Sequence, residues 1–400
     1  MYGDILNKSR YTDGKNYYLN NWYGVDPDPV AGVLMRYDFL CEIVGQERAD
    51  SNEPFTQSEY IDICKQFMEK HPTIDGKDGI AITLNGEDKN YEGTIKGMYG
   101  LKTYYETENG LEHIVKDPKY KEMMGFMNDL YTQGLLDKEW VVNKQEQWTQ
   151  KLSAGNVFST FSSYWDVDAA NTALASSVGE NAQFYTYKVV ANDVDPSETT
   201  FSGRSTLGWD AIGITDNCKN PEAAMKLIDF LASEEGQYLM MWGIEGENYD
   251  IVDGKHVPHQ DLVDGFQTDW DATVQSTGVR KWTWFIKNGN GSDGTPYDVT
   301  KYEVSKTSQL AQDRFGESDR WDTSEFEGLT PEGSTPEGLK WQKIEDIFAQ
   351  EFPKIVNASS HDEAMAEYDK MVSDMNNAGL EDVEKVITEN YQDRMELWGE

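Results

Sequence analysis

Trp165 and Trp209 are each followed directly by an aspartate, Asp166 and Asp210. The flat ring of a tryptophan stacks on the C–H face of a sugar, and a neighbouring carboxylate accepts hydrogen bonds from its hydroxyl groups. The sequence holds 12 Trp and 22 Tyr, more than a core of this size requires, and several fall outside periodic apolar segments. These residue types therefore favour sugar binding. The further candidates for aromatic contact are Trp22, Tyr23, Trp242, Trp282 and Trp284.

Each candidate also has a purely structural interpretation. An aromatic side chain can fill a hydrophobic core, and this alternative is stronger for Trp242, which lies on a predicted helix face. Asp166 and Asp210 can instead cap a helix or carry a surface charge. The sequence leaves both interpretations open.

Motifs for catalysis are absent from the sequence. It contains no Gly-x-Ser-x-Gly, His-Glu-x-x-His or phosphate-loop motif. Asp166 and Glu245 are a conceivable glycosidase pair, but such a pair needs a fixed separation across one cleft. With 72 Asp and Glu residues, chance pairs are common. We expect a protein that is not an enzyme, has no catalytic residues and binds its ligand without a cofactor.

The sequence also gives little support for a metal site. Cys41, Cys64 and Cys218 are odd in number and include no C-x-x-C pair, so we expect small apolar fillers. The loop at residues 288–294 is rich in oxygen donors but lacks the spacing and terminal Glu of an EF-hand. A plain turn is the favoured interpretation of this loop.

Length and charge restrict the class of protein. A chain of 400 residues exceeds what one hydrophobic core usually serves, so two domains are expected. The formal net charge of −37 argues against nucleic acid and against an anionic membrane surface as partners. No apolar run is long enough for a membrane span, and residues 1–5 lack the basic and apolar start of a signal peptide.

The region from 203 to 258 has the most specific order of elements. A predicted buried strand near 209–214 precedes Pro221, which suits the first turn of a helix. Ala224, Leu227, Ile228 and Leu231 recur at spacings of three and four, so we expect one face of this helix to be buried. Ser233 then caps a second helix, which the glycines after Trp242 end.

This order resembles the extracellular solute-binding proteins of ABC importers, in particular the large sugar-binding branch of Gram-positive bacteria. The resemblance is carried by Lys219-Asn220-Pro221-Glu222-Ala223-Ala224, Asp229-Phe230-Leu231, Ser233-Glu234-Glu235-Gly236-Gln237 and Trp242-Gly243-Ile244-Glu245-Gly246 with Tyr249. Each piece alone is weak, but the joint pattern over some fifty residues is specific.

The resemblance implies a two-lobed, periplasmic-binding-protein-like (type II) α/β fold with hinge crossings between the lobes. It implies that the protein captures an oligosaccharide between the lobes and delivers it to the transmembrane subunits of an ABC permease. The expected form is a monomer outside the cell, held to the membrane as a lipoprotein in its full-length form. The alternatives are a peptide-binding or adhesive lipoprotein and, with less support, the glycosidase.

The resemblance also implies where the lobes begin and end. Residues 1–25 correspond to the end of the first lobe and a hinge, 26–202 to the second lobe, and 203–300 to the return to the first. The remaining residues, 301–400, form a helical region that we expect to pack mainly on the second lobe. Hinge movement is expected near 22–29 and 200–208.

The first lobe is expected to be incomplete. The segment from Tyr11 to Leu19 is similar to one that lies well over a hundred residues into the family's precursors. The alignment thus predicts an N-terminally truncated chain without a signal peptide, a lipid-anchoring cysteine or most of the first lobe's initial βαβ units.

Within residues 26–202, short apolar strands alternate with amphipathic helices, the pattern of an α/β protein. Strands are predicted at 33–37, 80–84 and 157–161, and helices at 118–133 and 147–152. Thr56 and Glu59 form a predicted capping box. Near the C-terminus, helices are expected to meet at Pro353 and again at Ser359-Ser360.

Overall fold

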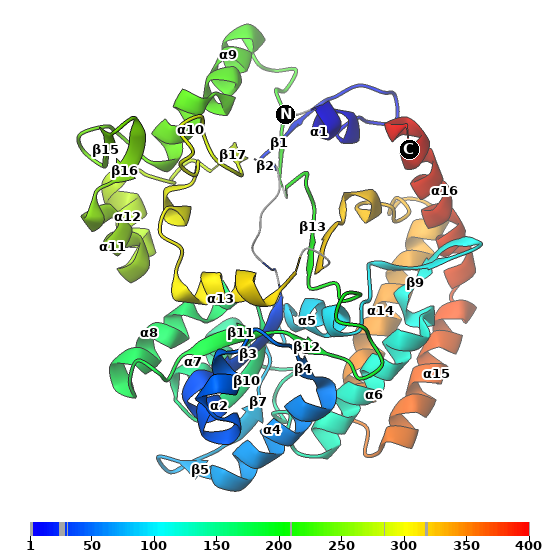
Figure 1. Cartoon of the computed structure of the whole chain (residues 1–400). Helices are drawn as coiled ribbons and strands as arrows, with labels where there is room; N and C mark the ends of the chain where they lie inside the picture. Colours follow the sequence, from blue (N-terminus) through cyan, green and yellow to red (C-terminus); the bar gives the residue numbers. More distant parts are fainter. Residues whose placement is uncertain are drawn as a thin grey trace. The chain divides into compact units, whose positions relative to one another are not determined.

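The computed structural model describes residues 3–23, 29, 31–208, 210–283, 285–316 and 319–399. The chain forms two compact units, drawn together in Figure 1. Unit 1 contains residues 1–27, 205–305 and 394–400, and unit 2 contains residues 28–204 and 306–393. Each unit is therefore assembled from segments that are distant in the sequence.

Unit 2 is built around a four-stranded sheet of order β11-β3-β10-β7. These strands are β3 (Gly32–Arg36), β7 (Ile80–Ile82), β10 (Val157–Ser162) and β11 (Phe184–Tyr187). β10 runs parallel to β7 and antiparallel to β3, with Ser162 opposite Gly32. Every residue of β3, β10 and β11 is buried, including the polar Ser159, Thr160 and Ser162 of β10 and Thr186 of β11.

Helices complete unit 2. α4 packs on β7, α5 packs on β3 and β10, and α14 and α15 lie alongside α6 (Figure 1). The helices are α2 (Tyr37–Val44), α3 (Gln46–Asp50), α4 (Gln57–Lys70), α5 (Tyr91–Met98), α6 (Pro118–Thr132), α7 (Gln145–Ser153), α8 (Asp168–Ser177), α13 (Lys306–Arg314), α14 (Pro336–Val356), α15 (His361–Asn377) and α16 (Leu380–Trp398), whose residues from 394 on belong to unit 1.

The smaller strands of unit 2 pair two by two: β4 (Phe55–Thr56) with β12 (Val189–Val190), β5 (Thr73–Ile74) with β6 (Lys77–Asp78), β8 (Tyr104–Thr107) with β9 (Gly110–His113), and β13 (Ser202–Arg204) with β18 (Arg320–Asp322). Short 3₁₀ turns occur at Ile114–Lys116, Tyr164–Val167 and Ser324–Phe326.

Several predictions for unit 2 are confirmed at the level of local structure. The helix predicted at 118–133 is α6, and its Met123, Met124 and Met127 are buried at 2% exposure or less. The Thr56 hydroxyl accepts from the backbone N–H of Glu59, whose carboxylate accepts in return from Thr56 N, so the capping box is present. The expected break at Pro353 is wrong. α14 continues through Pro353 to Val356, although a proline inside a helix removes one backbone N–H donor.

Unit 1 has shorter elements and a smaller core. They are α1 (Gly3–Lys8), β1 (Leu19–Asn20), β2 (Trp22–Tyr23), β14 (Ala211–Ile212), α9 (Pro221–Ala232), α10 (Glu234–Met241), β15 (Tyr249–Val252), β16 (Lys255–Pro258), α11 (Gln260–Thr268), α12 (Trp270–Thr277), β17 (Ile286–Lys287) and a 3₁₀ turn at Val299–Lys301. β1 pairs with β14, β2 with β17 and β15 with β16. The core gathers around Tyr238, Met241 and Trp242.

The predicted burial in unit 1 is partly wrong. Residues 12–13 form a turn, and the strand β1 that follows pairs with β14. In β14, Ala211 is exposed and Ile212 is half-buried, so this is not the buried strand that its sequence predicts. Helix α9 forms where expected, but it has no buried residue and leaves Leu227 58% exposed.

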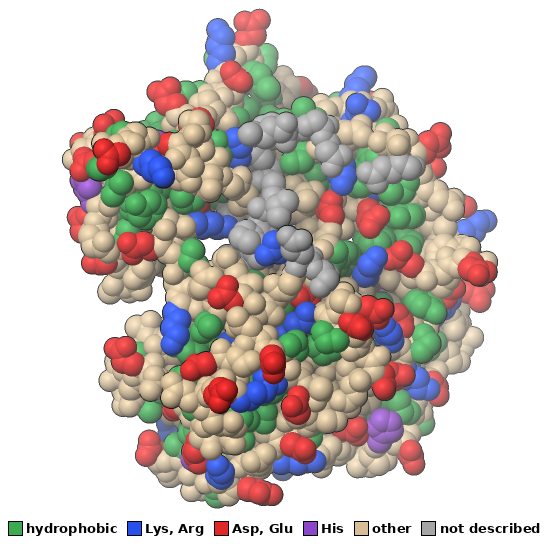
Figure 2. Space-filling view, viewed as in Figure 1, with side chains coloured by type: hydrophobic (Ala, Val, Ile, Leu, Met, Phe, Trp, Pro, Cys, Tyr) green, Lys and Arg blue, Asp and Glu red, His purple; other side chains and the backbone are tan. Residues whose placement is uncertain are grey.

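Acidic side chains spread over the visible surface and do not gather in one patch (Figure 2). In the part of the chain that the structure describes, no helix is both long and apolar enough to cross a membrane.

Candidate functional site

Polar loops follow the carboxyl ends of β7 and β10 in unit 2. Because these two strands are parallel neighbours, their carboxyl ends lie at the same edge of the sheet. In open α/β sheets this edge is where ligands bind. The loop after β7 carries Asp88 and Asn90, and the turn after β10 carries Trp165 and Asp166.

Asp166 joins the two loops. Its Oδ2 atom accepts hydrogen bonds from the Ser162 hydroxyl, from Ser163 N at 3.2 Å and from Asn90 Nδ2 at 3.1 Å. Asn90 Nδ2 also donates to Asp88 Oδ2 at 2.7 Å, so one amide bridges two carboxylates. The carboxylate of Asp166 is therefore fixed, and we find no partner for its Oδ1 atom among the described residues.

Trp165 stands beside this carboxylate with its side chain 39% exposed. The ring of Tyr164 meets it edge-on, with centroids 4.9 Å apart and planes at 78°. The guanidinium carbon of Arg204 lies 6.0 Å from the indole centroid. The indole is thus oriented by its neighbours while part of its surface remains open, as a stacking platform requires.

The electrostatic setting of this edge is acidic. Asp88 lies on the loop after β7, Asp166 in the turn after β10 and Asp168 at the start of α8, while Lys89 follows Asp88 and Arg204 lies near Trp165. Desolvation and, secondarily, the charge of Asp166 raise the pKa of Asp168 to about 6. A ligand at this edge therefore meets more negative than positive charge.

The remaining predicted contacts lie in unit 1. Trp22 and Tyr23 form β2, whose backbone pairs with Ile286 and Lys287, while their side chains lie outside the described part. Asp210 is exposed, and its backbone N–H donates to Asn21 Oδ1 at 3.0 Å. Trp282 is 55% exposed. Trp209 and Trp284 lie outside the described residues.

Trp242 must be corrected as a ligand contact. Its side chain is 0% exposed, and its Nε1 atom donates to the backbone oxygen of Pro296 at 3.0 Å. The rings of Tyr238, Tyr249 and Tyr302 surround it. With its N–H satisfied and no exposed face, Trp242 is a core residue of unit 1.

The two carboxylates considered as a glycosidase pair belong to different units, Asp166 to unit 2 and Glu245 to unit 1. Asp166 is committed to three donors on one oxygen, and Glu245 lies exposed in a turn. Neither environment identifies Asp166 and Glu245 as the acid and base of a glycosidase.

Hydrogen bonds to protein groups hold the oxygen-rich loop at 288–294 in place. Both oxygens of Asp293 are used, one by Thr295 and Tyr238 and the other by the backbone and ring nitrogens of His256. Although desolvation opposes it, these hydrogen bonds hold the pKa of Asp293 well below its usual range. Among the residues that the structure describes, no group of three or more His, Cys, Asp or Glu is placed to hold a metal ion.

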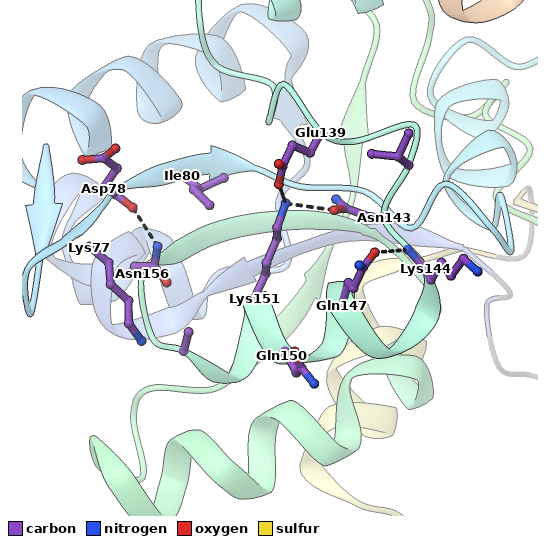
Figure 3. Close-up of a pocket in the computed structure, with 12 residues that line it drawn as sticks. Lys77, Asp78, Ile80, Glu139, Asn143, Lys144, Gln147, Gln150, Lys151 and Asn156 are labelled. Atoms are coloured by element: carbon purple, nitrogen blue, oxygen red, sulfur yellow. Dashed lines mark hydrogen bonds and ion pairs between the residues drawn. The ribbon is translucent and has the colours of Figure 1, made fainter.

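A polar groove of about 680 Å³ runs along the β7 edge of the sheet, from Asp78 and Asn156 at the amino-terminal ends of β7 and β10 to Asn143, which donates to the backbone oxygen of Leu84 beyond the carboxyl end of β7 (Figure 3). Lys151 reaches from α7 to Glu139 and Asn143, and it also contacts Asp137 at 2.8 Å. Asn156 donates to the backbone oxygen of Asp78. None of the described residues that line the groove is aromatic, and Lys151 is already paired with two carboxylates and an amide of the protein. We therefore do not assign the sugar site to this groove.

Sequence reasoning missed Asn90, Asp88 and Arg204. Asn90 and Asp88 follow a predicted strand, so their place after a strand's carboxyl end was a usable signal. Arg204 had no such signal because it reaches Trp165 through tertiary folding alone.

Comparisons with known proteins place these observations in a family. The sequence profile described as bacterial extracellular solute-binding protein matches residues 4–246. The polygalacturonan/rhamnogalacturonan-binding protein YtcQ of Bacillus subtilis (strain 168) is 26% identical over 277 residues, covering 66% of this chain and 52% of that protein. Lipoprotein LipO of the same organism is 24% identical over 239 residues, covering 56% of this chain and 45% of that protein. The chain spans about half the length of these curated relatives.

Solved structures share the fold over nearly the whole chain. The alginate-binding protein AlgQ2 matches with a TM-score of 0.66 and 16% identity, over 98% of this chain and 77% of its own. A solute-binding protein associated with an HMO-binding ABC transporter of Bifidobacterium longum infantis matches with a TM-score of 0.65 and 16% identity, over 98% and 79%. At 16% identity, the similarity to these structures shows a shared α/β fold. Since the family profile spans more than half of the chain, this protein belongs to the bacterial extracellular solute-binding proteins.

Proposed function

We propose that this chain is the ligand-binding part of an ABC-importer receptor, and that it binds an oligosaccharide without catalysing a reaction on it. The observation that carries the proposal is the oriented, partly open indole of Trp165 beside the anchored carboxylate of Asp166. Relatives whose names state polygalacturonan, alginate and HMO as ligands support the sugar class. The proposed partners are the oligosaccharide and the transmembrane subunits of a permease.

The charge of the site favours a neutral oligosaccharide over a uronate. Asp88, Asp166 and Asp168 outnumber the two cations Lys89 and Arg204, and the whole chain carries a formal charge of −37. A galacturonate oligomer would bring further carboxylates to this edge, and like charges repel. In this respect we propose a preference different from the polygalacturonan that names one relative.

We propose that units 2 and 1 are the second and first lobes of the receptor. The boundaries between the units at 27/28 and 204/205 fall within the predicted hinge segments 22–29 and 200–208. We propose that these segments absorb the backbone change on ligand binding. Trp22, Tyr23, Trp209, Asp210, Trp282 and Trp284 remain proposed ligand contacts from unit 1.

We further propose that the first lobe is completed by a segment that precedes residue 1, and that the full-length protein is an extracellular, lipid-anchored monomer. The exposed large apolar side chains concentrate in unit 1, although it is the smaller unit. Helix α9 has an amphipathic pattern but no buried residue, and Met225, Leu227 and Phe230 are exposed on it. Apolar faces of this size are normally covered.

A binding screen tests the receptor proposal. Kestose, trigalacturonic acid and an alginate trisaccharide would be added to this chain and to a version extended upstream, and the melting temperature and the heat of binding would be measured. A ligand that binds only the folded state raises its melting temperature. We expect a neutral sugar to give the largest rise, with no hydrolysis product in the mixture.

Substitutions locate the site. Trp165→Ala should lower affinity for the bound sugar about tenfold, while Trp165→Phe keeps most of it, since an aromatic contact is worth up to about 1.5 kcal/mol. Leu339→Ala is the control because Leu339 is a 68% exposed apolar side chain of the same unit. Binding of peptides but no sugar by either version would overturn the proposal.

A further inference from the structure

We propose that Trp270 of unit 1 forms a second sugar-stacking subsite, held in place by Arg280 and Phe266. The proposed occupant is one pyranose or furanose ring of the oligosaccharide, and the inference therefore rests on the proposed function. Trp270 lies beyond residues 4–246, the part of the chain that the family profile matches.

Trp270 is the first residue of α12 and is 44% exposed. The ring of Phe266, from α11, meets it edge-on with centroids 4.9 Å apart and planes at 63°. On the indole face, the guanidinium carbon of Arg280 lies 4.5 Å from the ring centroid. With Arg280 and Phe266 against it, the indole is oriented while 44% of the side chain remains exposed.

Arg280 is itself held rigidly. Its Nη2 atom lies 3.0 Å from Asp298 Oδ2, with 11% and 6% of the two side chains exposed. Its backbone has a φ of 58°, an unusual value for a residue other than glycine, and its N–H donates to Met240 O at 2.8 Å. Its Nε atom is buried without a hydrogen-bond partner among the described residues.

The unusual φ and the unpaired Nε atom each cost free energy of folding, which indicates that Arg280 does more than fill space. Backbone strain of this kind persists only where the surroundings enforce it, and it concentrates at binding sites. Here the enforced conformation places a cation on an exposed tryptophan. Because the ring is already oriented, a ligand that stacks on it loses little side-chain entropy.

The same construction occurs at the site in unit 2. Trp165 has an edge-on aromatic neighbour at 4.9 Å and an arginine within 6.0 Å of its ring centroid. Trp270 has Phe266 at 4.9 Å and Arg280 at 4.5 Å. Both tryptophans are also followed by an aspartate, Asp166 and Asp271. The repeated combination favours the same class of ligand for both.

Fluorine NMR on the full chain labelled with 5-fluorotryptophan tests the subsite. The Trp270 resonance is assigned by its loss in Trp270→Phe, and the Trp165 resonance by its loss in Trp165→Phe. Kestose, trigalacturonic acid and an alginate trisaccharide are then titrated separately, and Ala-Ala-Ala serves as the peptide comparison. We expect the sugar that binds best to shift both resonances with the same concentration dependence.

Affinity measurements supply a second readout. Trp270→Ala should weaken binding of that sugar by about three- to tenfold, and Trp270→Phe by less than about threefold. Leu239→Ala is the matched control because Leu239 is 47% exposed in the same unit and belongs to no such cluster. It should bind as the wild type does.

The outcomes separate the two proposals. A shift at Trp165 with none at Trp270 and full affinity in Trp270→Ala overturns the subsite and leaves the receptor proposal standing. No shift at either residue with any sugar overturns both. A shift at Trp270 with the peptide alone overturns the assignment to sugar, and equal losses in Trp270→Ala and Leu239→Ala overturn the stacking role.

Discussion

The Nζ atom of Lys188 lies 2.7 Å from Oδ2 of Asp319, and the two side chains are only 6% and 0% exposed. Lys188 follows β11, and Asp319 stands directly before β18. Asp319 also accepts from the Thr199 hydroxyl and from Gly316 N at 2.9 Å. This buried pair therefore ties the link between β11 and β12 to the segment that leads into β18, and the Thr199 hydroxyl adds the segment that leads into β13.

Removing one partner of this pair should destabilise unit 2 strongly. Asp319→Asn or Lys188→Met leaves a buried polar or charged group without its partner, which typically costs about 3–5 kcal/mol. Urea unfolding monitored by tryptophan fluorescence measures the loss. The control is Lys121→Met, which breaks an ion pair with Asp369 whose side chains are 37% and 65% exposed and should cost less than about 1 kcal/mol. Equal losses in the two variants would contradict the importance of burial.

His113 should make unit 2 sensitive to acid. Burial, with smaller contributions from Lys96 and Lys116, lowers the pKa of His113 from 6.5 to about 4. Since the folded state holds the neutral ring, its stabilising contribution is complete above pH 6.5 and is lost as the pH falls toward 4. The loss reaches at most roughly 3 kcal/mol.

His113→Asn keeps an acceptor for the N–H of Val115 and removes the titration. We expect the unfolding free energy of this variant to fall less between pH 6.5 and 4 than that of the wild type. His361→Asn, at a side chain 53% exposed, serves as the control. A pH dependence that is the same in His113→Asn and the wild type would refute the prediction.

The contribution of the α4 capping box to the free energy of unfolding should be measurable with single substitutions of Thr56. Thr56→Ala removes the acceptor for Glu59 N, and such a loss typically costs about 1 kcal/mol. Thr56→Ser retains the hydroxyl and should stay within a few tenths of a kcal/mol of the wild type. The midpoint of urea unfolding distinguishes the two. A Ser variant as unstable as the Ala variant would argue that the threonine methyl, and not the cap, matters.

Asn90 should control the position of Asp166. Asn90→Asp replaces the bridging donor with a third carboxylate between Asp88 and Asp166, where like charges repel. We expect weaker sugar binding in this variant. Calorimetric titration with the best-binding sugar at pH 7 measures it. Asn90→Ala, which removes the bridge without adding a charge, should show a smaller loss, and binding by Asn90→Asp equal to that of the wild type would contradict the prediction.

The local signals in the sequence were sufficient for the elements of unit 2. The period of apolar residues and the Thr56 capping box predicted helices and strands that the structure contains, because each signal acts over one or two turns. The motif order between 203 and 258 was likewise enough to identify the family, since that pattern is a property of the linear chain.

Burial was the part that the sequence could not decide. Trp165 and Trp242 both read as platform candidates, yet one is 39% exposed and the other 0%. Exposure depends on which distant segments pack against a ring, as Pro296 and Tyr302 do at Trp242. For the same reason α9 keeps its amphipathic pattern and still has no buried residue.

The sequence by itself thus determined the family, the α/β class and the residue chemistry suited to a sugar. Tertiary structure alone decided that Asn90 would anchor Asp166 and that Arg204 would reach Trp165. It also decided that Arg280 would hold Trp270. The physical reason is that helix periods, caps and turns are set by neighbours along the chain, whereas an oriented binding surface depends on contacts between segments that only folding brings together.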